Sequence, residues 1–280
     1  MTPDVGELCA MGEAAFRNVE FEEAEAWYEL ACKSSYRDPR PDRPTRFDYL
    51  IADRFARWEQ LRLLLPQRSV RRTSPDPGHV LLVQHREGRD YARTEESLWE
   101  AGAGAWQHFS FLTDHTGEGQ AKTFFRALAA AAGTSGFTAL TLLEDDVILA
   151  KNALDYIATT KIDDDLAFVS WFSVGRYSGP RLPPVLDCFR ARDYMFNQAI
   201  TFPARTVHEL LASDALKNWS EPHGADRIYK DVFPDRLVAV HYPNLVQHIG
   251  GAQSLVGNND HGPRTSPTFG QVADALDLVR

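Results

Sequence analysis

The chain has 280 residues, of which 44% are hydrophobic and 25% charged, a composition typical of a globular protein rather than a disordered or fibrous one. This length allows one domain of roughly 200 residues and a smaller unit. The net charge of −9 argues against nucleic acid as a partner, because binding to phosphate backbones draws on clustered Lys and Arg. No basic segment followed by an apolar stretch opens the chain, and no run approaches ~20 apolar residues, so we expect a cytoplasmic protein without a membrane partner.

The first part of the chain, up to about Leu65, shows the periodicity of helices. The segment GEAAFRNVEFEEAEAWYELACKSS resembles part of a tetratricopeptide helical hairpin, in which small side chains allow close packing. We predict a helical unit over residues 1–72 and a linker over 73–78, which contains Pro75, Pro77 and Gly78. A single repeat makes a poor binding groove, so we expect this unit to cover an edge of the rest of the protein or to form a homodimer.

Residues 79–280 alternate between strand and helix patterns, which predicts an α/β domain with a mixed, mainly parallel sheet and flanking helices. Strands are predicted from His79, His108, Phe137, Leu166, Met195 and Arg236. Helices are predicted over residues 94–101, 119–132, 151–158 and 204–212.

Three adjacent acidic residues, Glu144, Asp145 and Asp146, follow the predicted buried strand that ends at Leu143. Ligands of open α/β sheets bind at the carboxyl ends of the strands, so a functional site is expected there. Burying three carboxylates without a cation is costly, since desolvation and like charges both oppose their ionisation. The triplet therefore predicts a divalent metal, although a solvated acidic turn is the alternative.

The segment LLEDDV, from Leu142 to Val147, resembles the DxD-type motif of nucleotide-sugar-dependent glycosyltransferases of the GT-A fold. The segment HYPNLVQHIGGAQSL, from His241 to Leu255, is similar to the end of the catalytic core in several such families, including the N-acetylglucosaminyltransferase IV family. The resemblance implies a GT-A, Rossmann-like fold and a UDP-sugar donor. It also implies that Asp146 and His248 bind the metal, that Asp145 contacts donor ribose or sugar, and that Glu144 supports them. Carboxylate oxygens with one imidazole suit Mn²⁺, with Mg²⁺ as a substitute.

Further donor contacts are expected from the loop after the first strand and from two neighbouring elements. In the resembling families this loop holds the nucleotide, and arginines offer paired donors to phosphate. The candidates are Gln84, Arg86, Glu87 and Arg93 in and after the loop, Asp114 at the end of the second strand, and Lys122 and Arg126 on the following helix.

An inverting reaction needs a carboxylate base to deprotonate the acceptor hydroxyl. The segment SEPHGADRIYKDVF offers Asp226, which we favour, and Glu221; helix capping is the alternative role for Asp226. A retaining reaction needs no such base, and the sequence leaves the stereochemistry open. The acceptor is expected to be a small molecule or a protein. Aromatic candidates to stack against it are Trp171, Phe172, Tyr177, Tyr194 and Trp219, of which we favour Tyr177 and Trp219 because their surroundings resemble loops.

Two other functions stay open. A nucleotidyltransferase or another metal-dependent nucleotide-processing enzyme would also gather carboxylates around a metal, although the chain has no GxxxxGK[ST] loop. A helical-repeat adaptor with an inactive α/β domain is the second alternative.

Overall fold

The computed structural model describes residues 67–115, 117, 119–173, 184–194, 197–219, 226–249, 266 and 268–279. The chain divides into two compact units, residues 1–63 and 64–280, and the described residues all belong to the second. Most of the predicted helical unit therefore lies outside the described residues. Within them, no helix is long and apolar enough to cross a membrane.

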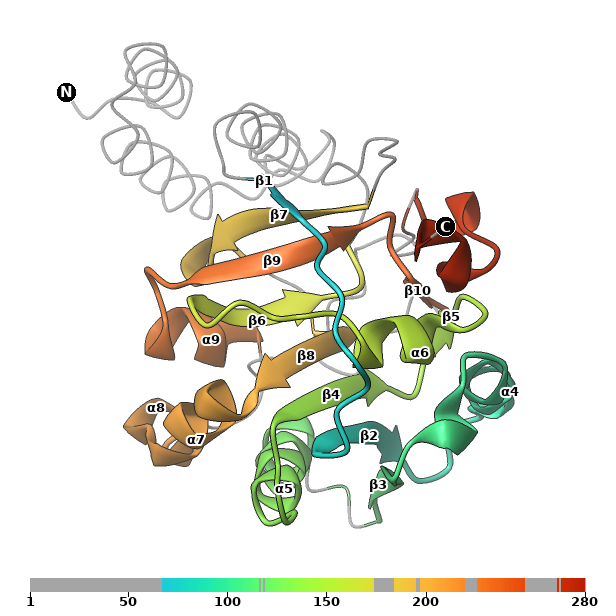
Figure 1. Cartoon of the computed structure of the whole chain (residues 1–280). Helices are drawn as coiled ribbons and strands as arrows, with labels where there is room; N and C mark the ends of the chain where they lie inside the picture. The colour runs from blue at the N-terminus through green and yellow to red at the C-terminus, as the bar shows by residue number, and fades with distance from the viewer. Residues whose placement is uncertain are drawn as a thin grey trace, which may run out of the picture. The chain divides into compact units, whose positions relative to one another are not determined.

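The described unit is built on one large twisted sheet, with a small second sheet beside it (Figure 1). The strands are β1 (Gln67–Ser69), β2 (His79–Arg86), β3 (His108–Asp114), β4 (Ala139–Glu144), β5 (Val147–Leu149), β6 (Leu166–Ser170), β7 (Val185–Arg190), β8 (Ala199–Pro203), β9 (Leu237–Tyr242) and β10 (Val246–His248). The large sheet has the order β1-β7-β9-β6-β8-β4-β2-β3, and β5 pairs with β10 in the small sheet. Strand β2 runs parallel to β3 and β4, and β6 runs parallel to β9. Strands β7 and β8 run antiparallel to their neighbours.

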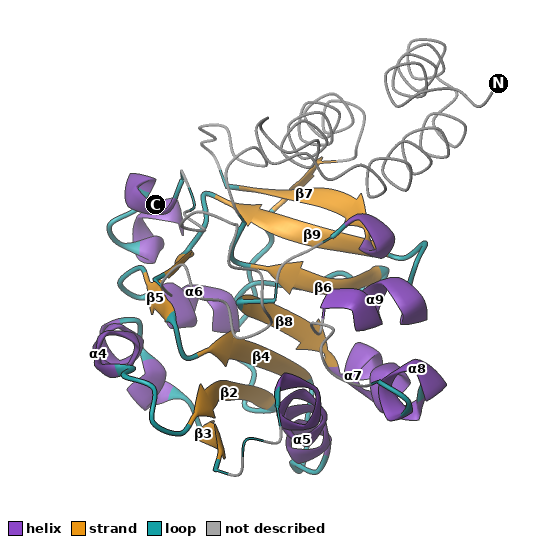
Figure 2. Cartoon of the chain, turned by 180° about the vertical axis from the view of Figure 1, so that it is seen from behind, coloured by secondary structure: helices purple, strands orange, loops and turns teal. Residues whose placement is uncertain are grey.

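Helices cover both faces of this sheet (Figure 2). They are α4 (Ala92–Glu100), α5 (Gln120–Ala132), α6 (Ala153–Ala158), α7 (Ala204–Ala212), α8 (Asp214–Lys217) and α9 (Asp226–Val232). Short 3-10 turns are η1 (Ala103–Ala105), η3 (Ala191–Asp193), η4 (Phe269–Gln271) and η5 (Ala275–Val279). The predicted α/β fold with a mixed sheet and flanking helices is confirmed.

Aromatic side chains bind the helices to the two faces. On one face, Phe124 of α5 and Tyr229 of α9 both pack against Phe202 of β8. On the opposite face, Tyr156 of α6 packs against Trp171 and His241 at the ends of β6 and β9. Every one of these side chains is buried, and Tyr229 is the one that lies outside the predicted elements, because α9 is not among the four predicted helices. The two layers fix the strand ends between them.

The six strands predicted from the sequence are all present, and the four predicted helices correspond to α4, α5, α6 and α7. Four strands were not predicted: β7 and the three-residue strands β1, β5 and β10. Strand β1 pairs with β7, and Arg72 bridges to Thr160. Residues 67–72, which the sequence assigned to the helical unit, therefore belong to the unit that contains the sheet.

The parallel strands bring their carboxyl ends to one edge of the sheet. In the register of β2, Gln84 lies opposite Leu112 of β3 and Glu144 of β4, and Arg86 lies opposite Asp114. The buried run of β4 ends at Leu143, as its sequence predicted. The acidic triplet thus leaves the sheet beside the ends of β2 and β3.

Candidate functional site

The acidic triplet forms a tight turn between β4 and β5. Glu144 is the last residue of β4, Asp145 and Asp146 make the turn, and β5 begins at Val147. Strand β10 pairs antiparallel with β5 so that His248 lies opposite Val147. The N–H of Ile249 donates a 2.7 Å hydrogen bond to the carbonyl of Asp146. This pairing carries the end of β10 to the acidic turn.

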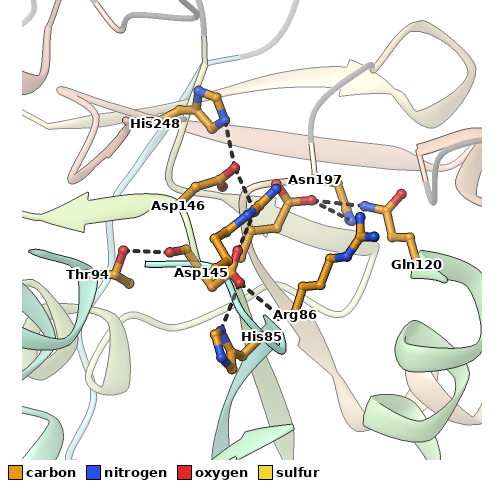
Figure 3. Close-up of polar contacts among 10 residues, drawn as sticks. His85, Arg86, Thr94, Gln120, Asp145, Asp146, Asn197 and His248 are labelled. Atoms are coloured by element: carbon orange, nitrogen blue, oxygen red, sulfur yellow. Dashed lines mark hydrogen bonds and ion pairs between the residues drawn. The ribbon is translucent and has the colours of Figure 1, made fainter. Parts of the chain in front are cut away.

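The two predicted metal ligands, Asp146 and His248, meet there (Figure 3). Their Oδ2 and Nε2 atoms are 3.3 Å apart, and the side chains are 16% and 9% exposed. The other polar atom of each, Asp146 Oδ1 and His248 Nδ1, is buried without a hydrogen-bond partner among the described residues. Burial by itself raises the pKa of the Asp146 carboxyl, but the hydrogen bond and charge of His248, together with Arg89, lower it overall. Asp146 is therefore held as a carboxylate.

The chemistry of this pair fits a divalent cation. When two ligand atoms each lie about 2.1 Å from an ion and form a right angle at it, the two atoms are about 3 Å apart. The distance between Asp146 Oδ2 and His248 Nε2 is close to this value. No group of three or more His, Cys, Asp or Glu suited to a metal occurs among the described residues. The described part of the chain thus offers two ligands, an arrangement that suits Mg²⁺ or Mn²⁺ held jointly by protein, water and substrate phosphates.

Asp145 lies inside the protein and joins the acidic turn to the end of β2. Its side chain is buried, with the residue 3% exposed. Oδ2 accepts hydrogen bonds from His85 Nδ1 and from the N–H of Arg86, both at 2.9 Å. The buried hydroxyl of Thr94 on α4 donates to its carbonyl at 2.8 Å. Asp145 therefore fixes the positions of both the turn and the loop after β2.

An arginine side chain already places a positive charge beside Asp145 and Asp146. Arg89 Nη1, from the loop between β2 and α4, lies 2.5 Å from Asp145 Oδ1 and 3.1 Å from Asp146 Oδ2. Burial lowers the pKa of Arg89, but the charges of Asp145 and Asp146 outweigh this effect and raise it. The guanidinium thus offsets the negative charge that the sequence assigned to a metal.

Glu144 faces the opposite side of the sheet, toward α5. Its Oε1 accepts a 3.0 Å hydrogen bond from Gln120 Nε2 and lies 3.5 Å from Asn197 Nδ2. Asn197 is held in turn by the hydroxyl of Tyr229 on α9, which donates to its Oδ1. Glu144 thus links β4, α5 and the segment before β8.

Gln84 is the most unusual polar residue of this edge. It is 8% exposed, and both its Oε1 and its Nε2 are buried without a partner among the described residues. Because paired residues of parallel strands share a face, its side chain lies on the same side as Glu144. Leaving one such group unpaired costs about 1–3 kcal/mol, so the amide is available to a ligand.

The other predicted donor contacts occupy varied positions. Arg86, the last residue of β2, and Glu87 after it are both exposed, and Glu87 pairs with His115. Asp114 is buried, and its carboxylate accepts a 3.1 Å hydrogen bond from Gly119 N–H, where the φ of 91° favours glycine. This contact sets the start of α5. Three further candidates are exposed on helices: Arg93 on α4, and Lys122 and Arg126 on α5.

The two candidates on α5, Lys122 and Arg126, lie at different distances from the acidic triplet. Gln120, the first residue of the helix, reaches Glu144. Arg126 follows six residues later, about 9 Å along the axis at 1.5 Å per residue. Lys122 lies within the first turn and is the better placed of the two. No contact of Lys122 or Arg93 with the acidic turn is found among the described residues.

The acceptor side is only partly described. Asp226 is the first residue of α9, with its side chain outside the description, and Glu221 and Tyr177 lie outside the described residues. Trp219 packs edge-on against Phe124, and its indole N–H is buried without a partner among the described residues. Three other aromatic candidates for acceptor stacking, Trp171, Phe172 and Tyr194, are buried in the core. Their strand-end positions explain this, because both faces of the sheet are covered.

Five residues of the site were not predicted: His85, Arg89, Thr94, Gln120 and Asn197. Arg89 lies between Arg86 and Arg93 in REGRDYAR, so the same argument that nominated its neighbours applied to it. Gln120 and Asn197 carry no sequence signal, because a single amide in a loop or a helix start is common.

Comparison with known proteins adds little. No family model matches the chain, and no curated protein matches it. The chain is similar in structure to a glycosyltransferase involved in the glycosylation of the major capsid of PBCV-1, with a TM-score of 0.41 and 14% identity over 65% of this chain and 98% of the other. It is also similar to A197 from STIV, with a TM-score of 0.35 and 11% identity over 60% and 83% of the two chains. Similarity this weak does not assign a function, which has to be argued from the site itself.

Proposed function

We propose that this protein is a metal-dependent glycosyltransferase that moves a sugar from a nucleotide-sugar, by default a UDP-sugar, to a hydroxyl of its acceptor. The observation that carries the proposal is the meeting of Asp146 and His248 at the carboxyl edge of the sheet, 3.3 Å apart. Each also has a buried polar atom without a partner among the described residues. Two segments far apart in sequence thus supply a compact carboxylate–imidazole pair.

Asp146 and His248 would hold Mn²⁺ or Mg²⁺. A bound divalent ion would offset the negative charge that grows on the departing nucleoside diphosphate. The protein's own contribution is to keep Asp146 ionised, through His248 and Arg89, and to fix its backbone through the bond from Ile249 N–H. Asp145 anchors this turn to β2, which keeps the pair from shifting relative to the donor loop.

The donor would lie across the ends of β2 and β4. Gln84 offers a buried amide with an unused donor and an unused acceptor, the complement of a nucleobase edge that also carries both. Arg86 and Lys122 are exposed near this edge and would add positive charge for phosphate. The contact expected between Asp145 and the donor requires one of its internal hydrogen bonds to be exchanged.

The acceptor would approach from the side of α9. If the reaction inverts the anomeric centre, Asp226 at the start of α9 is the proposed base and Glu221 the second candidate. The buried aromatic residues Trp171, Phe172 and Tyr194 take no part in acceptor binding in this proposal, since they belong to the core. Trp219, half-buried before α9, keeps its candidate role.

The proposal is tested by incubating the protein with a panel of nucleotide-sugars, with and without Mn²⁺, and measuring released nucleoside diphosphate. We expect Mn²⁺-dependent release that Asp146→Asn removes. Asp164→Asn is the matched control, because Asp164 is exposed in a second run of three acidic residues, Asp163–Asp165, just before β6. A nucleotidyltransferase, given pyrophosphate, would instead convert the nucleotide-sugar into a nucleoside triphosphate and a sugar 1-phosphate, and an adaptor would show neither reaction.

A further inference from the structure

Arg89 contacts one carboxylate oxygen of each aspartate in the acidic turn, and one of these is the Asp146 oxygen that faces His248. Its Nη1 contacts Asp145 Oδ1 at 2.5 Å and Asp146 Oδ2 at 3.1 Å. Asp146 Oδ2 is also the atom that faces His248 Nε2. An oxygen that already accepts from an arginine and faces an imidazole has no free lone pair for a metal. A cation can reach this oxygen only if one of the two contacts is given up.

Of the two neighbours, Arg89 is the one that is free to leave. The side chain of His248 is 9% exposed, whereas that of Arg89 is 28% exposed. Arg89 lies in the loop between β2 and α4, on a long flexible side chain. His248 belongs to β10, which is hydrogen-bonded to β5. A guanidinium that remained would also stand within a few ångströms of the incoming ion and repel it.

The departure of Arg89 changes Asp145 in a selective way. Asp145 Oδ2 keeps its two hydrogen bonds, from His85 and from the Arg86 N–H. Oδ1, for which Arg89 is the hydrogen-bond donor seen among the described residues, is uncovered. The backbone anchor of the turn stays in place, and one carboxylate oxygen becomes available to the donor ribose or sugar.

We propose that Arg89 is the built-in counter-ion of the acidic turn and that the divalent metal displaces it, which exposes Asp145 Oδ1 to the donor. This inference rests on the proposed function, since it takes Asp146 and His248 as the metal ligands. It assigns Arg89 a positioning role: it neutralises the turn when no metal is bound and makes metal binding weaker than the ligand pair alone would allow.

The test measures Mn²⁺ binding to the full chain without any donor, from the electron paramagnetic resonance signal of free Mn²⁺. Removing a competing charge-assisted contact and a nearby positive charge should tighten binding about tenfold in Arg89→Gln. Arg89→Lys, which keeps the charge, should remain within about threefold of the wild type. Arg190→Gln is the matched control, because Arg190 is an exposed residue at the end of β7, opposite Leu237 at the start of β9. This variant should bind Mn²⁺ with the affinity of the wild type.

The thermal melting temperature gives a second readout that does not depend on activity. Arg89→Gln should melt below the wild type without metal, and Mn²⁺ should raise its melting temperature more than that of the wild type, because tighter binding stabilises the folded state more. If the wild type binds Mn²⁺ and Arg89→Gln binds it equally or more weakly, the displacement idea is wrong while the metal site stands. If neither protein binds Mn²⁺ although both are folded, the proposed metal site fails and this inference fails with it.

Discussion

His248 Nε2 lies 3.3 Å from Asp146 Oδ2 because the three-residue strands β5 and β10 pair beside the end of β4. Through this pairing, the imidazole of His248 at the end of β10 reaches the acidic turn before β5. Removing either proposed ligand should therefore reduce Mn²⁺ affinity by more than the 10–100-fold that is typical when only an outer partner of a ligand is lost. Titration of Asp146→Asn and His248→Asn with Mn²⁺ checks this, and Asp164→Asn should bind as the wild type does. Unchanged affinity in His248→Asn would remove His248 from the site.

Asp145 should matter for stability more than any exposed aspartate. In Asp145→Asn a neutral amide replaces a buried carboxylate that accepts from His85, the Arg86 N–H and Arg89. We expect the free energy of unfolding to fall by about 3 kcal/mol, as when one partner of a buried ion pair is removed. Asp235→Asn is the control: Asp235 forms exposed ion pairs, and its loss should cost at most about 1 kcal/mol. Urea denaturation followed by circular dichroism measures both, and equal costs would contradict the anchoring role.

Gln84 should show opposite effects on stability and on donor binding. Its amide is buried with both polar atoms unpaired among the described residues, so Gln84→Met removes a desolvation cost at similar volume. We expect the free energy of unfolding to rise by about 1 kcal/mol, and donor binding to weaken about tenfold through the loss of two hydrogen bonds. Denaturation and calorimetry with a nucleoside diphosphate separate the two effects. A loss of stability without any change in binding would show that the amide has only a structural role.

Two buried histidines should make the fold sensitive to mild acid. Burial lowers the pKa of His79 and of His241 to about 4, while an unfolded histidine titrates near 6.5. The folded state therefore binds fewer protons between these values, and stability falls as the pH is lowered through this window. Each histidine should cost about 2 kcal/mol between pH 7 and pH 5.

His79→Gln tests this slope, because the amide can keep the hydrogen bond to Thr141 without titrating. The variant should lose about 2 kcal/mol less than the wild type over the same pH range. Parallel slopes for the wild type and His79→Gln would show that His79 does not titrate in this window.

The sequence predicted the main strands because each is a run of apolar residues long enough to be recognised alone. Strand β4 is the clearest case, with Leu140, Leu142 and Leu143 buried. Strand β7 was missed because Asp187 interrupts its apolar residues, which leaves only two on each side. Strands β1, β5 and β10 have three residues each, and only their pairing partners make them strands. No local pattern carries that information.

The candidate site was predictable where it depends on strand ends and not where it depends on loops. The positions of Glu144, Asp145 and Asp146 follow from the end of a buried strand, and the carboxyl-edge rule then places Gln84 beside them. The contact of Arg89 with two aspartates depends on the course of the loop after β2, which no periodicity describes. The same holds for Asn197, whose position is set by Tyr229 of α9.

The most direct test of the central claim is calorimetric binding of UDP to the folded protein, with and without Mn²⁺. We expect UDP to bind at least tenfold more tightly with Mn²⁺ than without it, because Asp146 and His248 would share the ion with the diphosphate. Asp146→Ala should lose this dependence on Mn²⁺, while Asp164→Asn should retain it. Absence of UDP binding under both conditions, or equal Mn²⁺ dependence in Asp146→Ala, would contradict the assignment of this edge as a metal-dependent donor site.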